Sequence, residues 1–322
     1  MNIVYTFLID EGLRRIVFSR ITAARLLVLL TAFLIFMSTA LSAERASSGA
    51  SRKAEARRQR IDVKGFVFSQ RVIRGKGWTL RKVQDEKRLW KAQLEVEDGT
   101  IRDFGNGAES DSWVRFLLWP IPEPGTVGIP NPHLIFVLCY GGGANGPEFL
   151  NVVDTRDGFS EVFNSGDKFN FNGVEDLDGD GIPEIIGMSR AFLGVMGLAV
   201  AESPMPTVVF RYDNVLKRYV CSNKSFRRVL DEAIPSFERA YDAVKPVSGK
   251  IDLKTDDAKT FSGQFGPLIR LVVELFYAGD GEKAKSLLSR DLGKNDARTV
   301  LEAIEKVLSE DPFYQELISS GR

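Results

Sequence analysis

A short acidic turn near the middle of the chain, with the sequence DLDGDGIPE, constrains the fold more than any other segment. Asp176, Asp178 and Asp180 stand at its first, third and fifth positions, and the glycines that follow the last two permit a tight backbone curl. Hard divalent cations prefer oxygen ligands at this spacing. The carbonyl of Ile182 and the carboxylate of Glu184 would complete a shell of about six or seven oxygens. The turn therefore predicts a calcium site with these five residues as ligands.

The residues after the turn distinguish it from an EF-hand. An EF-hand needs a glutamate at position twelve and a helix on each side, whereas position twelve here is Gly187. Pro183 and the β-branched Ile185 and Ile186 predict that the chain leaves the turn as a strand. We therefore expect a calcium loop between two strands. The alternative is a solvated hairpin end without metal, because Asp and Gly both tolerate a positive φ.

The pattern Asp-x-Asp-x-Asp-Gly-x-x-Glu followed by Ile-Ile resembles the FG-GAP or VCBS-type repeat, the calcium-binding hairpin loop of integrin-α-like propellers. The resemblance implies a metal ion that staples the turn between neighbouring strands. It covers about fifteen residues, and no repeat at the blade spacing of about 40–50 residues accompanies it. A complete propeller is therefore not implied.

The first 43 residues differ in composition from the rest. Residues 26–37 are almost wholly apolar, with four arginines before them and a run of small residues after them. This order is typical of a secretory signal peptide cleaved after Ser42 or Ala43, although the segment before the apolar run is long for one. An uncleaved anchor is the alternative, but a spanning helix needs about 20 apolar residues. We predict a periplasmic or extracellular protein that contacts membrane only through residues 26–43, if these are retained.

The charge of the remaining chain argues against a nucleic-acid partner. Removing residues 1–43 leaves a net charge of about −2, whereas nucleic-acid binding requires a strongly basic surface. Residues 44–60 are locally basic and predict a solvated linker. Cys139 and Cys221 lie in strand-like segments, and in an exported protein they could form one disulfide. Two buried thiols are the equal alternative.

The remaining sequence predicts an α+β fold. Residues 61–223 are rich in β-branched and aromatic residues between turn signals, which predicts one antiparallel β domain, partly propeller- or sandwich-like, of about eight to ten strands. Residues 224–322 change to helical spacing and predict a small C-terminal helical domain. The segment ELFYAGDGEKAKSLL is similar to the inner part of a tetratricopeptide hairpin, but one such hairpin is too few for a solenoid.

The sequence gives little support for catalysis. Its single histidine, His133, begins a predicted strand. Ser189, in the segment GMSRA, imitates a nucleophile elbow, but that motif requires a histidine downstream of the serine. The glycine-rich residues 141–146 lack the lysine of a phosphate-binding loop and predict a wide turn. A ligand-binding loop near the acidic turn is the alternative for this segment.

These features predict an exported, non-enzymatic binding or envelope-associated protein with a structural calcium site and a protein or carbohydrate ligand. Two alternatives stay open. The first is a secreted, carbohydrate-active hydrolase whose paired carboxylates the sequence does not identify. The second is a membrane-anchored protein that docks a partner through its helices.

Overall fold

The computed structural model describes ten parts of the chain: residues 72–84, 90–108, 113–120, 133–140, 146, 148–156, 158–246, 250–251, 253 and 263–319. All of them belong to one compact unit, Arg58–Arg322. The predicted signal or anchor segment and the basic linker lie outside the described residues. Among the described helices, none has the length and apolar character needed to cross a membrane.

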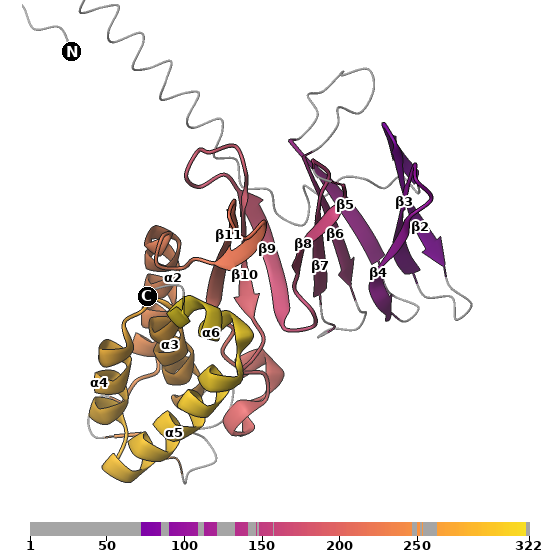
Figure 1. The fold of residues 1–322 in the computed structure, drawn as a ribbon. Coiled ribbons are helices and arrows are strands. Elements are labelled where there is room, and N and C mark those ends of the chain that lie inside the picture. The colour runs from indigo at the N-terminus through magenta and orange to yellow at the C-terminus, as the bar shows by residue number, and fades with distance from the viewer. Residues whose placement is uncertain are drawn as a thin grey trace, which may run out of the picture. The chain divides into compact units, whose positions relative to one another are not determined.

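Two antiparallel sheets form the β region (Figure 1). The four-stranded sheet runs in the order β1 (Val72–Gly75), β2 (Trp78–Gln84), β3 (Trp90–Val96) and β4 (Ile101–Ala108). The eight-stranded sheet contains β5 (Trp113–Trp119), β6 (Leu134–Tyr140), β7 (Glu148–Asp154), β8 (Ser160–Asn164), β9 (Phe169–Glu175), β10 (Glu184–Ser189), β11 (Thr207–Asp213) and β12 (Arg218–Cys221). Its order is β12-β11-β10-β9-β7-β6-β5, with β8 paired to β7.

The eight-stranded sheet is covered on both faces around β6. Successive side chains of a strand point to opposite faces. In β6, Phe136 belongs to the core shared with the helices, whereas Val137 belongs to the core shared with the four-stranded sheet. Six of its seven residues are buried, which explains why the strand is a continuous apolar run and not an alternating one.

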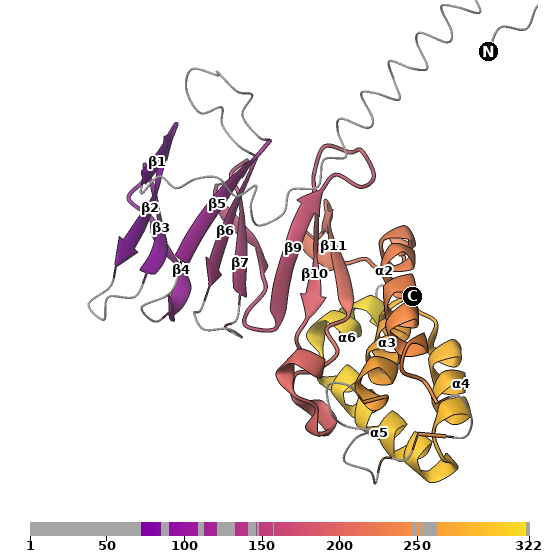
Figure 2. The same ribbon diagram turned by 180° about the vertical axis from the view of Figure 1, so that it is seen from behind.

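The C-terminal part contains five described α-helices (Figures 1 and 2). They are α2 (Arg227–Asp242), α3 (Phe265–Tyr277), α4 (Gly281–Asp291), α5 (Lys294–Glu310) and α6 (Pro312–Ser319). Two 3-10 turns, η2 (Val195–Gly197) and η3 (Val200–Glu202), lie between β10 and β11. The α+β fold class, with antiparallel strands followed by helices, is confirmed.

The sheet and the helices share one core. A single cluster of buried residues runs from Leu117 in β5 through Phe210 in β11 to Leu317 in α6. Helix α3 lies at its centre, and eleven of its thirteen residues are buried. The boundary predicted near residue 223 is therefore a change of secondary structure within one core.

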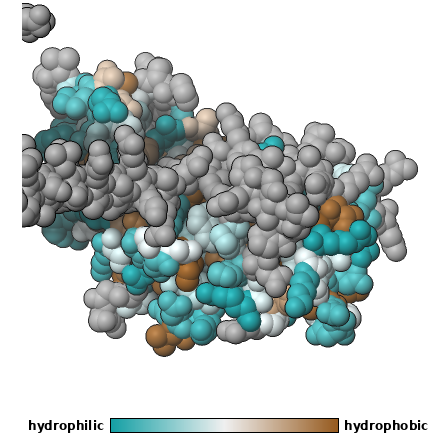
Figure 3. Space-filling view, turned by 90° about the horizontal axis from the view of Figure 1, so that it is seen from above, coloured by the Kyte–Doolittle hydropathy of each residue, from teal (hydrophilic) through white to brown (hydrophobic). Residues whose placement is uncertain are grey.

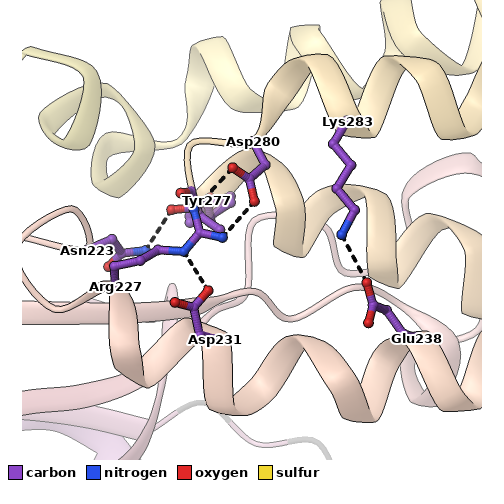
Figure 4. A network of polar contacts seen from close by, with 8 residues as sticks. Asn223, Arg227, Asp231, Glu238, Tyr277, Asp280 and Lys283 are labelled. Carbon is purple, nitrogen blue, oxygen red and sulfur yellow. Dashed lines mark hydrogen bonds and ion pairs between the residues drawn. The ribbon is translucent and has the colours of Figure 1, made fainter.

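A polar network ties α2 to the turn between α3 and α4 (Figure 4). The guanidinium of Arg227 forms an ion pair with Asp280 at 2.6 Å and another with Asp231 at 2.7 Å. Asn223 donates to the carbonyl oxygen of Tyr277 at 3.0 Å, which links the end of the sheet to α3. These contacts fix the α3–α4 hairpin, which turns through Gly279 at a φ of 83°.

The two cysteines are not bonded to each other. Both are buried free thiols, and burial raises the pKa of each to about 12. Cys139 belongs to the core under the four-stranded sheet and Cys221 to the core under the helices. Of the two sequence-based alternatives, the structure contains the buried thiols.

Candidate metal centre

The acidic turn is the connection between β9 and β10, at the upper end of both strands in Figure 1. Glu175 and Glu184 are Cα partners where the two strands meet the turn. Gly179 and Gly181 have φ values of 81° and 89°, in the left-handed region that side chains disfavour. The predicted loop between two strands is therefore present.

Three carboxylates converge inside this loop. Asp176, Asp178 and Glu184 each offer one oxygen, and these oxygens lie within 4.8 Å of one another. Calcium binds oxygens at about 2.3–2.6 Å, so two oxygens on one ion are separated by about 5 Å at most. The spacing fits a shared divalent cation.

Backbone N–H groups hold two of the carboxylates in place. Asp176 accepts hydrogen bonds from the N–H of Gly179 at 2.8 Å and of Gly181 at 3.1 Å. The Oε2 of Glu184 accepts the N–H of Leu177 at 2.7 Å. Each carboxylate oxygen can accept more than one interaction, so these bonds orient the groups and leave capacity for a cation.

The site has a surplus of negative charge. Glu184 is 1% exposed, and burial raises its pKa to about 8, with further contributions from Asp178, Asp180 and Asp176. Partial desolvation, and then the charges of Asp178 and Asp176, also raise the pKa of Asp180, although the N–H of Ile182 acts in the opposite direction. A bound divalent cation would favour the ionised forms and reverse this effect. Without a cation the ionised carboxylates repel one another, and a bound cation would remove this repulsion.

The other two predicted ligands lie differently. Asp180 is exposed, and its Oδ1 accepts the N–H of Ile182 at 2.7 Å. The cluster of three carboxylates does not include it. The side chain of Ile182 is half-buried and packs against the core shared with the helices, while its carbonyl oxygen as a ligand stays a prediction. Of the four predicted carboxylate ligands, the structure brings Asp176, Asp178 and Glu184 together.

Two residues far away in the sequence support the loop. The indole Nε1 of Trp119 donates to the carbonyl oxygen of Gly181 at 2.9 Å. The hydroxyl of Tyr219 donates to the carbonyl oxygen of Pro183 at 2.9 Å. Sequence reasoning missed both, because nothing in the local pattern indicates which distant strand ends lie beside the loop.

The remaining sequence candidates lie elsewhere. Ser189 is fully buried, and its hydroxyl donates to Asp311 at 2.9 Å, so it is not an exposed nucleophile. Gly146, the described part of the glycine-rich segment, accepts a hydrogen bond from Arg190, which follows the far end of β10. A single ligand bridging this residue and the acidic turn would have to span the six residues of β10, about 20 Å. His133 is exposed at the start of β6.

The described geometry thus supports cation binding at the β9–β10 loop, with three carboxylates as the first ligands. Comparison of the chain with protein-family models, with curated proteins and with solved structures finds no match.

Proposed function

We propose that this is an exported, non-enzymatic binding or envelope-associated protein in which a calcium ion stabilises the β9–β10 loop. The convergence of Asp176, Asp178 and Glu184 within 4.8 Å carries the proposal. Calcium is favoured because all available ligands are oxygens and because residues 178–181 are exposed, so that water can complete a large shell.

The role assigned to the ion is structural. A ligand that binds only the folded state stabilises it by RT ln(1 + [L]/Kd), about 2.7 kcal/mol at one hundred times Kd. Extracellular calcium modules bind at about 10⁻⁴ to 10⁻³ M, so such a site is occupied in about half to nine tenths of the molecules where calcium is about 1 mM. Its main effect is to neutralise a buried carboxylate at the base of a hairpin.

Thermal unfolding with and without calcium tests the proposal. We expect calcium at about one hundred times Kd to raise the melting temperature by about 5 °C over the value in chelator. Asp178→Asn should lose most of this gain and still fold, because Asp178 is exposed. Magnesium should be less effective, because it requires a smaller and more regular shell.

Asp98→Asn is the matched control. Asp98 is an exposed aspartate in the turn between β3 and β4, where its Oδ1 accepts the N–H of Thr100 at 2.8 Å. This variant should keep the full calcium response. A melting temperature that calcium leaves unchanged in the unaltered chain would refute the metal site.

No specific observation favours the two alternatives over this proposal. A cavity of about 290 Å³ on the helices is lined by two carboxylates, but each forms an ion pair with a lysine: Glu238 with Lys283 at 3.0 Å and Asp242 with Lys245 at 2.7 Å. A docking face would require exposed hydrophobic side chains. Among the described residues of α3, α4 and α5, no large hydrophobic side chain is exposed.

A further inference from the structure

The hairpin between β11 and β12 lies beside the proposed calcium loop. Ile185, near the start of β10, is the Cα partner of Phe210 in the antiparallel strand β11. The end of β11 therefore lies at the same edge of the sheet as the start of β10. The hydroxyl of Tyr219, in β12, reaches the carbonyl oxygen of Pro183 at the end of the loop. The hairpin tip and the loop therefore share one end of the sheet.

The tip of this hairpin carries the most exposed large hydrophobic side chain of the described chain. Val215 is 89% exposed and Leu216 is 56% exposed. Viewed from this end, the described surface is mostly hydrophilic, with hydrophobic residues in small separate groups (Figure 3). Turns normally carry polar residues, so two adjacent exposed aliphatic side chains at a tip require an explanation.

The tip has a fixed conformation. The Oδ1 of Asp213 accepts the N–H of Val215 at 2.7 Å and of Leu216 at 2.9 Å. Lys217 has a φ of 54°, which returns the chain to β12. The aspartate is thus turned into the hairpin while the two aliphatic side chains point outward, so little ordering is needed before they bind a partner.

We propose that this end of the sheet docks onto the surface of an anionic phospholipid membrane when calcium is bound. The inference rests on the calcium site proposed above. Calcium would neutralise the acidic loop and coordinate phosphate oxygens of the headgroups. Val215 and Leu216 would insert at the boundary between the headgroups and the acyl chains. Lys217 and Arg211 lie on the same hairpin and complement anionic headgroups, whereas Arg218 forms an ion pair with Glu316 at 2.7 Å.

The shape and chemistry favour a membrane over other partners. A stable protein interface buries about 1,200–2,000 Å², far more than a two-residue tip offers. Sugar-binding surfaces use exposed aromatic side chains, whereas this tip is aliphatic. A small convex aliphatic tip flanked by cations matches a fluid anionic interface. Without calcium, the acidic loop would repel the same surface, so binding should depend on the ion.

The experiment uses the full chain and vesicles of equal parts phosphatidylglycerol and phosphatidylcholine, or of phosphatidylcholine alone. A polarity-sensitive dye is attached at Val215→Cys or, as the matched control, at Val200→Cys. Val200 is a 38% exposed valine in η3, beyond the far end of β10. The native thiols do not interfere, since Cys139 and Cys221 are 4% and 0% exposed.

We expect the dye at position 215 to shift to the blue only when calcium and anionic vesicles are both present, and the dye at position 200 not to shift. In cosedimentation, Val215→Asn should weaken the calcium-dependent part of binding about tenfold or more, and Val200→Asn should not. The apolar N-terminal residues could bind vesicles without calcium. The dye at position 215 distinguishes the two contacts, because it responds only to the surroundings of the hairpin tip.

Other outcomes would overturn the proposal in distinguishable ways. Calcium that raises the melting temperature without moving the dye at position 215 would remove the membrane role and leave the metal site. If calcium changed neither the melting temperature nor the dye emission, both the metal site and the membrane role would be refuted. A dye shift in chelator, a shift with soluble glycerol phosphate alone, or calcium-dependent self-association in place of vesicle binding would each assign the tip to something other than a calcium-dependent membrane contact.

Discussion

Two glutamates that are each 1% exposed, Glu184 and Glu274, lie at unrelated places in this protein and have different consequences. Glu184 lies among other carboxylates that a cation can join. Glu274, in α3, is also 1% exposed; its Oε2 accepts the N–H of Thr207 at 3.0 Å, and its Oε1 has no hydrogen-bond partner among the described residues. Burial raises the pKa of Glu274 to about 7, although the bonds from Thr207 act in the opposite direction.

The raised pKa of Glu274 makes stability depend on pH. The folded state holds the proton more tightly than the unfolded chain, whose pKa is near 4.5, so this contribution is complete below pH 4.5 and is lost as the pH rises through about 7. Glu274→Gln should therefore stabilise the protein relative to the unaltered chain above pH 7, by up to roughly 3 kcal/mol, and should not do so at pH 4.5.

Urea unfolding of both proteins at several pH values measures this difference. Glu282→Gln, at an exposed position in α4, is the control and should show no comparable dependence on pH. A Glu274→Gln effect of the same size at pH 4.5 and pH 8.5 would contradict the proposed titration.

At the residue scale, the sequence predicts local chemistry well. Asp176, Asp178 and Glu184 lie within nine residues, so one turn is enough to gather them. Trp119 and Tyr219 stabilise the same loop from 62 and 36 residues away, a relation that only the sheet order creates. Glu274 gives no signal in the sequence either, because its burial depends on packing against β11.

At the scale of elements, one aspartate joins three of them. Asp311 precedes α6, and its Oδ1 accepts the N–H of Phe313 at 3.1 Å, as a helix N-cap does. Its Oδ2 accepts the hydroxyls of Ser189, at the end of β10, and of Tyr277, at the end of α3. All of these contacts are buried, so one side chain links α3, α6 and the sheet inside their shared core.

Asp311→Ala should destabilise the protein by roughly 3 kcal/mol or more, because it leaves two buried hydroxyls and one N–H without their acceptor. Asp296→Ala, in the first turn of α5, is the matched control and should cost about 0.5–1 kcal/mol. Urea unfolding measures both values. Equal effects of the two substitutions would mean that the Asp311 network adds nothing beyond a helix cap.

The strands and helices themselves were largely predictable, since β-branched runs and helical spacing appear on either side of residue 223. The covering of β6 on both faces was not, because an apolar run does not say which layers will pack on it. Helix α3 is buried on nearly all sides, and its sequence FGPLIRLVVELFY has only two charged residues, as expected of a helix inside a core.

At the scale of the whole described unit, the shared core predicts cooperative unfolding. The four tryptophans, Trp78, Trp90, Trp113 and Trp119, all lie in the β region, so their fluorescence reports on it, whereas the helices dominate the far-ultraviolet circular dichroism. Because one buried cluster joins the two, their urea transitions should coincide. Removing residues 224–322 should leave no folded β domain. Loss of the helical signal at clearly lower urea would instead indicate two independent domains.

The position of β6 between two layers also bears on assembly. Neither the four-stranded sheet alone nor the helices alone can shield it, so a chain with only one layer in place leaves one side of an uncharged seven-residue strand open to water. Uncharged segments of this length and β-propensity are those from which intermolecular sheets grow. Escape from aggregation therefore depends on both layers closing over the same strand in quick succession.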